Sequence, residues 1–472
     1  MKTYLLLSIA IISLVSCKTD TNDDGNVAYF GGEIINPNTN FVIISKAEKV
    51  LDTILLDKSN RFLYKLKHIE SGLYTFKHGG EVQMVFLEPN DSIIFRINTL
   101  EFDESLVYTG EGAKKNNYLM NEFLENENEE PEIFKYSQLE PAAFEHKLDS
   151  VKSIKTKKFQ NFIKKHKTSE LFNKVAQSNI DYKYYANKEI YPFIHYGEGK
   201  HNIINSLPKN FYSYRANINY NDDFLKDYFN YNAFLRSNFS NQALKQHFKH
   251  TKECQVKRSS ICYNLDRLNI IDSLVTNKTI KNDLLYHNTM MFLAKNQNLD
   301  SNDVIVESFL NKSTDVKGKT MVSDYAKSLT KLKPGENFPN IEVLNYKNSA
   351  FNSNDLINAP TAICFWSHSF YDHFKNSHNK IKELKAKYPE VNFIIINIDD
   401  HNTGKWVTTL EKNRYPLTNE YQFKNPEASR HLLAIHPMTK VIVINKNNKI
   451  VNNNANIFAV DFEQDLLGLI NQ

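Results

Sequence analysis

The residues with the clearest capacity for covalent chemistry are the cysteines, of which this chain of 472 residues has four. Cys254 and Cys262 lie in a polar segment, and an oxidising compartment would allow them to form a local disulfide. Because spacing alone does not establish the geometry of a bridge, a paired and an unpaired state both stay open. Cys364 lies in the apolar run 361–366, where a thiol more often packs as a small hydrophobic group than acts as a nucleophile.

The fourth cysteine, Cys17, follows an apolar run that extends from Leu5 to Val15. The run is shorter than the roughly 20 apolar residues that span a bilayer, and a lysine precedes it, which is typical of a signal peptide. Its end, Leu14–Cys17, resembles a lipobox, at which the cysteine thiol accepts a diacylglycerol. An ordinary apolar N-terminus that contains a cysteine is the alternative. We expect residues 1–17 to be a lipoprotein signal peptide, with membrane contact through the lipid on Cys17.

The composition indicates an exported, folded protein. Residues 18–26 are polar and lack an apolar period, which predicts a flexible tether. The length suffices for roughly two to four domains, and a hydrophobic content of 41% supports buried cores. A net charge of +4, from 58 basic and 54 acidic residues, is close to balanced, and with the export signal it argues against a nucleic-acid binder. We therefore expect a lipid-anchored protein of the bacterial cell envelope, on either the periplasmic or the cell-surface face.

Three regions follow the tether, and together they predict a multidomain α+β fold. Residues 27–110 contain short β-branched or aromatic runs separated by turn residues, which predicts an antiparallel, sandwich-like β-domain. Residues 111–330 contain stretches with an apolar period near 3.6, which predicts a helical domain. Residues 331–472 alternate strands with helices and end in a hairpin and a helix, which predicts an α/β domain.

The order of elements in residues 331–472 resembles the thioredoxin-like domain of envelope disulfide reductases of the TlpA type. The resemblance covers only this region and rests on four local sequences, namely Pro334-Gly335 with Phe338-Pro339, Phe365-Trp366, Pro437 with Thr439 before a strand, and Asn445 to Ile450. It implies a thioredoxin-like α/β domain. It also implies that Pro437 is a cis-proline that packs against the active-site helix.

The active-site motif of that family is absent from this chain. Family members carry Cys-x-x-Cys shortly after Phe-Trp, at a helix N-terminus that lowers the pKa of the first thiol. Here Phe370 stands in place of the attacking cysteine and His373 in place of the resolving cysteine, while a shift of one residue would put Ser369 first. Because disulfide exchange requires a thiolate, the resemblance does not carry redox activity to this chain.

Histidines of the same loop offer a different chemistry. In the resembled fold the residue before the cis-proline faces the active-site loop, and here that residue is His436, with His368 and His373 on the loop. Imidazoles that meet there could bind a transition metal, with Asp372 as a further ligand, whereas hydrogen-bonded histidines at the surface are the alternative. No ligand spacing identifies a site, so we expect no metal and no other cofactor. Ser369 with His373 is the only candidate for nucleophilic catalysis.

These features predict a lipoprotein that is not an enzyme. Its degenerate thioredoxin-like domain would bind a peptide or a partner protein in the groove beside His436 and Pro437. One alternative is a thiol–disulfide oxidoreductase that uses Cys364, or Cys254 with Cys262. The other alternative is a metal-binding protein that uses the loop histidines.

Overall fold

The computed structural model describes residues 26–47, 49–196, 200–251, 259–296, 299–368, 370–400 and 404–470. These residues divide into two compact units. The first extends to Leu124 without Gly79–Glu81, and the second contains Gly79–Glu81 and the chain from Glu125 onward. The predicted signal peptide with Cys17 lies outside the described residues, as do Cys254 and Ser369. Within the described ranges, no helix has the length and apolar character needed to cross a membrane.

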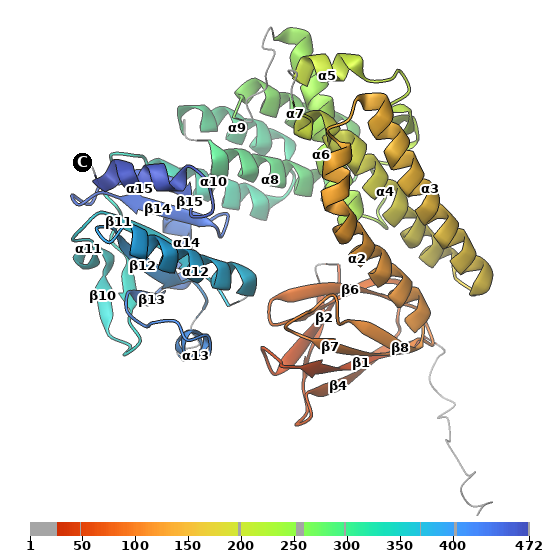
Figure 1. The fold of residues 1–472 in the computed structure, drawn as a ribbon, viewed down its shortest axis with the longest axis horizontal. Coiled ribbons are helices and arrows are strands. Elements are labelled where there is room, and N and C mark those ends of the chain that lie inside the picture. The colour runs from red at the N-terminus through yellow and green to blue at the C-terminus, as the bar shows by residue number, and fades with distance from the viewer. Residues whose placement is uncertain are drawn as a thin grey trace, which may run out of the picture. The chain divides into compact units, whose positions relative to one another are not determined.

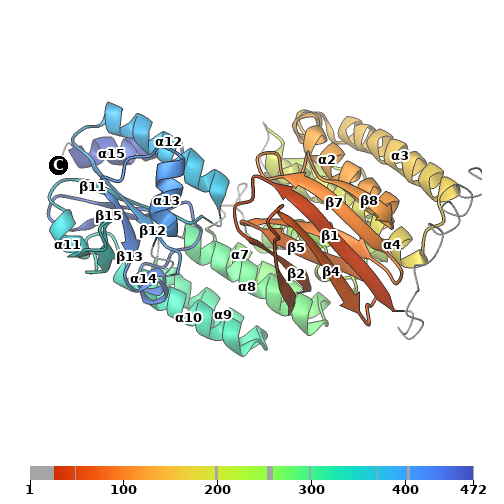
Figure 2. The same cartoon turned by 90° about the horizontal axis from the view of Figure 1, so that it is seen from below.

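The described residues of the first unit form two four-stranded sheets, with the strand orders β4-β1-β7-β8 and β3-β2-β5-β6 (Figure 2). The strands are β1 (Val27–Ile35), β2 (Phe41–Lys46), β3 (Lys49–Leu55), β4 (Arg61–Lys67), β5 (Gly72–His78), β6 (Glu81–Leu87), β7 (Ser92–Asn98) and β8 (Val107–Glu111).

Aromatic side chains between the two sheets form the core of this unit. Alternate residues of β7 are buried, as expected for a strand with one face on a core. The ring of Phe95 in β7 lies 5.3 Å from that of Phe30 in β1 and 4.9 Å from that of Phe76 in the opposite sheet. The sandwich-like domain predicted from strand spacing is confirmed. One pair differs from an antiparallel arrangement, because β1 and β7 run parallel after the chain has passed through the other sheet.

Residues between the β-domain and the last region are helical, which confirms the predicted helical middle (Figure 1). The helices are α2 (Ala113–Tyr136), α3 (Pro141–Lys165), α4 (Glu170–Ile194), α5 (Lys200–Ser206), α6 (Phe229–His250), α7 (Ile261–Leu274), α8 (Lys278–Lys295), α9 (Asn302–Lys312) and α10 (Val316–Lys331), with short 3₁₀ helices at Ser213–Asn217 and Leu299–Ser301.

A fully buried carboxylate joins three segments of this helical region. Glu189 of α4 accepts hydrogen bonds from the Tyr214 hydroxyl at 2.7 Å and from Asn238 Nδ2 of α6 at 2.5 Å. Arg215 donates to both of its oxygens, with Nε at 2.9 Å from Oε1. A charge can be buried in this way because each of its oxygens has a charged or polar donor.

The last region contains a seven-stranded sheet with the order β10-β9-β13-β12-β11-β14-β15. Its strands are β9 (Glu342–Leu344), β10 (Ala350–Asn352), β11 (Thr361–Trp366), β12 (Asn392–Asn397), β13 (Glu420–Phe423), β14 (Lys440–Ile444) and β15 (Ile450–Asn456). Its helices are α11 (Ser353–Leu356), α12 (Tyr371–Lys387), α13 (Lys405–Lys412), α14 (Pro426–Leu432) and α15 (Phe462–Ile470).

This sheet has the thioredoxin-like arrangement that the resemblance implied. Strands β11 and β12 are parallel and are connected by α12, and β14 and β15 form an antiparallel hairpin that joins the other side of β11. All residues of β11 are buried, as expected for a central strand with both faces covered. The peptide bond between His436 and Pro437, just before β14, is cis.

A buried lysine supports the loop that leads to this proline. Lys440, the first residue of β14, is 2% exposed. Its ammonium group donates to the carbonyl of Leu433 at 2.9 Å and to that of Ala434 at 3.0 Å. Burial lowers the pKa of Lys440 to about 7, because a low-dielectric interior disfavours the charged form.

This shift predicts a specific pH dependence of stability. Between pH 7 and 10.5, the ordinary pKa of the side chain, the unfolded chain binds more protons at Lys440 than the folded protein does. The contribution of this group to the free energy of unfolding should therefore increase as the pH rises through that window. Lys440→Met should remove this contribution, and chemical denaturation at several pH values measures it. The surface variant Lys424→Met is the control, and a slope that persists unchanged in Lys440→Met would contradict the prediction.

Candidate functional site at the carboxyl ends of the parallel strands

The candidate site lies where the parallel strands β11, β12 and β13 end. In the strand register, Trp366 pairs with Asn397 and Asn397 pairs with Gln422, so these three strands reach the same edge of the sheet. Side chains that follow such strands are brought together, which is why ligands often bind at this edge. The loop after β11, which leads to α12, is the segment that contains Cys-x-x-Cys in the resembled family.

One carboxylate fixes this loop. Asp399, which follows β12, accepts hydrogen bonds from the Ser367 hydroxyl, from the His368 backbone N–H at 2.9 Å and from Asn397 Nδ2 at 2.8 Å. His368 Nδ1 lies 2.5 Å from Asp399 Oδ2. Burial raises the pKa of Asp399, but the hydrogen bonds from His368 and Ser367 outweigh burial and hold the pKa below its usual value. The carboxylate therefore stays charged and holds the loop backbone in place.

Neither residue that stands in place of the family's cysteines in the ungapped match has a thiol. Phe370 is 55% exposed, and its side chain has neither a thiol nor a hydroxyl group. His373, in the first turn of α12, has its Nε2 3.1 Å from the Ser377 hydroxyl, and its ring lies against Phe458. Ser369 lies outside the described residues, so its pairing with His373 stays a prediction.

The three loop histidines are directed at different partners. His368 faces Asp399, His373 faces Ser377, and the ring of His436 lies 6.1 Å from that of Tyr325. Among the described residues, the one group of His, Cys, Asp and Glu ligands close enough to hold an ion lies in the helical region. The metal site considered at this loop, with Asp372, stays an alternative that these contacts do not favour.

The backbone beside the cis-proline is in contact with the helical region. His436 and Pro437 are exposed. The Tyr325 hydroxyl of α10 nevertheless donates to the His436 carbonyl at 2.9 Å, and the His436 N–H donates to the Ala434 carbonyl. The backbone next to the proline therefore already has partners from within the chain. No signal in the sequence pointed to Tyr325, because it lies 111 residues before His436.

Cys364 lies in the middle of the sheet, away from this loop. It pairs with Ile395 of β12 on one side and Val441 of β14 on the other, and it is 3% exposed. Burial raises the pKa of its thiol to about 12. The interpretation of Cys364 as a buried small hydrophobic residue agrees with this environment, in which a thiolate is strongly disfavoured.

A buried hydrogen-bonded pair lies beneath α12. His378 Nε2 is 3.1 Å from Glu420 Oε1, and both side chains are almost completely buried. Burial raises the pKa of Glu420, and the hydrogen bond from His378 opposes that rise. The pair attaches the helix to β13. The sequence alone did not indicate this pair or Asp399. Asp399 could have been noticed, because it directly follows the apolar strand that ends at Ile398.

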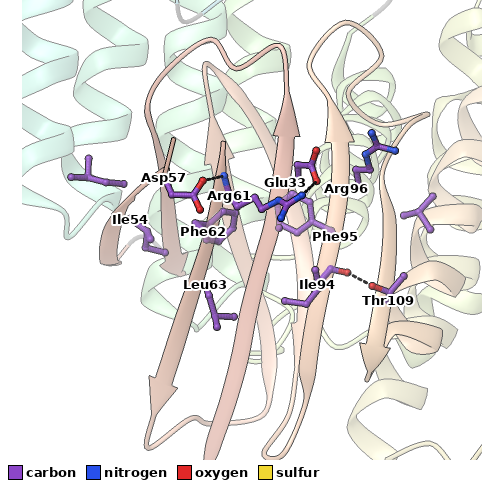
Figure 3. Close-up of a pocket in the computed structure, with 13 residues that line it drawn as sticks. Glu33, Ile54, Asp57, Arg61, Phe62, Leu63, Ile94, Phe95, Arg96 and Thr109 are labelled. Carbon is purple, nitrogen blue, oxygen red and sulfur yellow. Dashed lines mark hydrogen bonds and ion pairs between the residues drawn. The ribbon is translucent and has the colours of Figure 1, made fainter. Parts of the chain in front are cut away.

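A second hollow lies within the first unit, on the outer face of the sheet that contains β1 (Figure 3). Its apolar part is formed by Leu63, Ile94 and Val107, which are between 40% and 61% exposed. At its rim Arg61 Nη2 lies 3.3 Å from Glu33 Oε2. These two charged groups are thus paired with each other.

No protein-family model matches the chain, and no curated protein matches it. Solved structures overlap it in part. A proposed thiol-disulfide oxidoreductase of Bacteroides vulgatus is 20% identical, with 30% of this chain and 99% of that chain covered and a TM-score of 0.26. The thioredoxin domain of a B. vulgatus thiol-disulfide oxidoreductase is 16% identical, with 30% of this chain and 96% of that chain covered and a TM-score of 0.24. A SCO1/SenC family lipoprotein of Bacillus anthracis is 14% identical, with 28% of this chain and 95% of that chain covered and a TM-score of 0.25. Such low identities and TM-scores do not indicate the activity of this chain. The thioredoxin-like character of the last region rests on its own strand order.

Proposed function

We propose that this chain is a lipid-anchored lipoprotein of the bacterial envelope whose thioredoxin-like domain binds a peptide or protein partner beside Pro437 and is not an oxidoreductase. The observation that carries the proposal is the loop after β11. Asp399 holds Ser367 and His368 of this loop, and the ring of Phe370 is exposed where a catalytic thiol would stand. An exposed aromatic side chain next to backbone that is already held in place is suited to binding, because less conformational entropy is lost when a partner docks.

The surroundings of Phe370 support an apolar contact. Phe458 and Val460, which follow β15, are 44% and 97% exposed, and Phe458 lies against the ring of His373 in α12. His436 and Pro437 are also exposed, and the proposed groove would have them as its other boundary. An extended peptide with an apolar or aromatic side chain is the partner that these residues would accommodate.

The alternative is a thiol–disulfide oxidoreductase with cysteines in unusual positions. Cys364 is poorly suited to that role, because a thiol with a pKa near 12 is almost wholly protonated at neutral pH. Cys254 lies outside the described residues, so its bridge to Cys262 stays a prediction.

A change at Phe370 tests peptide binding. Peptides selected from a random library for binding to the wild-type protein should lose about 2 kcal/mol or more of binding free energy in Phe370→Asp, about thirtyfold in Kd, if the ring is the anchor. Phe351→Asp alters an exposed aromatic residue of the same domain, in β10, and should leave Kd unchanged. The proposed groove would be refuted by either of two results. Both variants could lose the same binding free energy, or the selected peptides could bind Phe370→Asp as tightly as they bind the wild type.

The reactivity of Cys364 distinguishes the oxidoreductase alternative. In a chain of residues 18–472 with Cys254→Ser and Cys262→Ser, Cys364 is the only remaining thiol. We expect it to react with a disulfide reagent only as fast as the protein unfolds, because the native thiol is buried and protonated. A denaturant series of reaction rates measures this. Rapid reaction in the native protein, together with reductase activity, would revive the redox alternative.

A change at Cys17 tests the proposed lipid anchor. In a bacterial host that processes lipoproteins, the wild-type chain should incorporate labelled fatty acid and partition with the membrane fraction. Cys17→Ser should do neither, because it lacks the thiol that accepts the diacylglycerol. The matched variant Cys364→Ser should behave as wild type. Labelling that persists in Cys17→Ser would exclude this cysteine as the site of lipid attachment.

A further inference from the structure

The end of α6 and the beginning of α7 bring together four side chains that the proposed function does not use. His247 and His250 lie in the last turn of α6, and Cys262 and Asp266 lie in the first two turns of α7. One ligand atom from each of the four lies within 4.8 Å of all the others. We propose that these four side chains form a binding site for a divalent transition-metal ion of the zinc type.

The spacing on each helix directs both pairs to one place. His247 and His250 are three residues apart, and Cys262 and Asp266 are four apart, so each pair shares one face of its helix. The two helices pack against each other. Each helix therefore supplies two ligands to a common point, an arrangement that needs no further chain segment to complete a four-ligand site.

The distances between the ligand atoms agree with such a site. Asp266 Oδ2 lies 2.8 Å from His250 Nε2 and 3.8 Å from His247 Nδ1, and Cys262 Sγ lies 4.0 Å from the same His250 Nε2. In a tetrahedral site with bonds of about 2.0 to 2.3 Å, ligand atoms are roughly 3.3 to 3.8 Å apart. Small side-chain rotations are sufficient to admit the ion.

The chemistry of the donors favours zinc over the common alkaline-earth ions. Two imidazole nitrogens and one thiolate are ligands that Zn²⁺ prefers, whereas Ca²⁺ and Mg²⁺ require mainly oxygen ligands, of which Asp266 is the one present in the group. The negative charges of the Cys262 thiolate and the Asp266 carboxylate balance the two positive charges of the ion. The bound site is therefore electrically neutral, which suits a position where the His247 side chain is 1% exposed and that of Asp266 is 15% exposed.

The position of the ligands on the helices also favours binding. Cys262 and Asp266 lie near the N-terminus of α7, where the helix dipole stabilises negative charge. On binding, the Cys262 thiol gives its proton to solvent and its sulfur forms a bond to the ion. The same sulfur cannot also be bridged to Cys254, so metal binding and the predicted disulfide exclude each other.

A metal titration of the full chain tests the proposal, after purification under reducing conditions and removal of metal with a chelator. Co²⁺ is the spectroscopic probe for the zinc site. We expect a single equivalent of Co²⁺ to produce the visible absorption of tetrahedral cobalt together with a thiolate charge-transfer band, and Zn²⁺ to displace it. Zn²⁺ should also raise the Tm, because the site exists only in the folded protein.

Variants separate this site from adventitious binding. Cys262→Ser should abolish the charge-transfer band, and His250→Ala should weaken Zn²⁺ binding by at least about tenfold. Cys364→Ser and His146→Ala, which alter the same residue types elsewhere, should leave both unchanged. Three results would overturn the proposal: no tetrahedral bands in the reduced wild type, a charge-transfer band that survives Cys262→Ser, or a native disulfide between Cys254 and Cys262.

Discussion

The charged carboxylate of Asp399 is the interaction on which the geometry of the candidate site depends. It is mostly buried, and it is tolerated there because Ser367, His368 and Asn397 direct hydrogen bonds at it. These bonds hold Ser367 and His368, the residues directly after β11, in place. Phe370, at the start of α12, is exposed beyond them.

Local sequence was sufficient to predict several parts of the fold. The apolar run of β11, the hairpin after Pro437 and the alternation in β7 each reflect a short-range periodicity, and the structure contains all three elements. The parallel pairing of β1 with β7 was not predictable in this way, because it depends on the path of the chain through a second sheet. Periodicity determines the type of an element, whereas its partners depend on contacts that are distant in sequence.

The same limit applies to the site. Pro437 and the missing thiols were visible in the sequence, but Tyr325, Lys440 and the pair of His378 with Glu420 act through contacts that no local pattern encodes. The three loop histidines show the same limit, since each is directed at a different neighbour. Residue types in a loop indicate available chemistry, and their hydrogen-bond partners decide whether it is realised.

The hydrogen bond from Tyr325 to the His436 carbonyl is one of the contacts that couple the helical region to the last region. A ligand that needs this carbonyl must share or displace the tyrosine hydroxyl, so its binding free energy includes a contribution from the position of α10. By thermodynamic linkage, occupancy of the groove then alters the stability of the helical region by the same amount. Through this bond the position of α10 bears directly on the backbone beside Pro437.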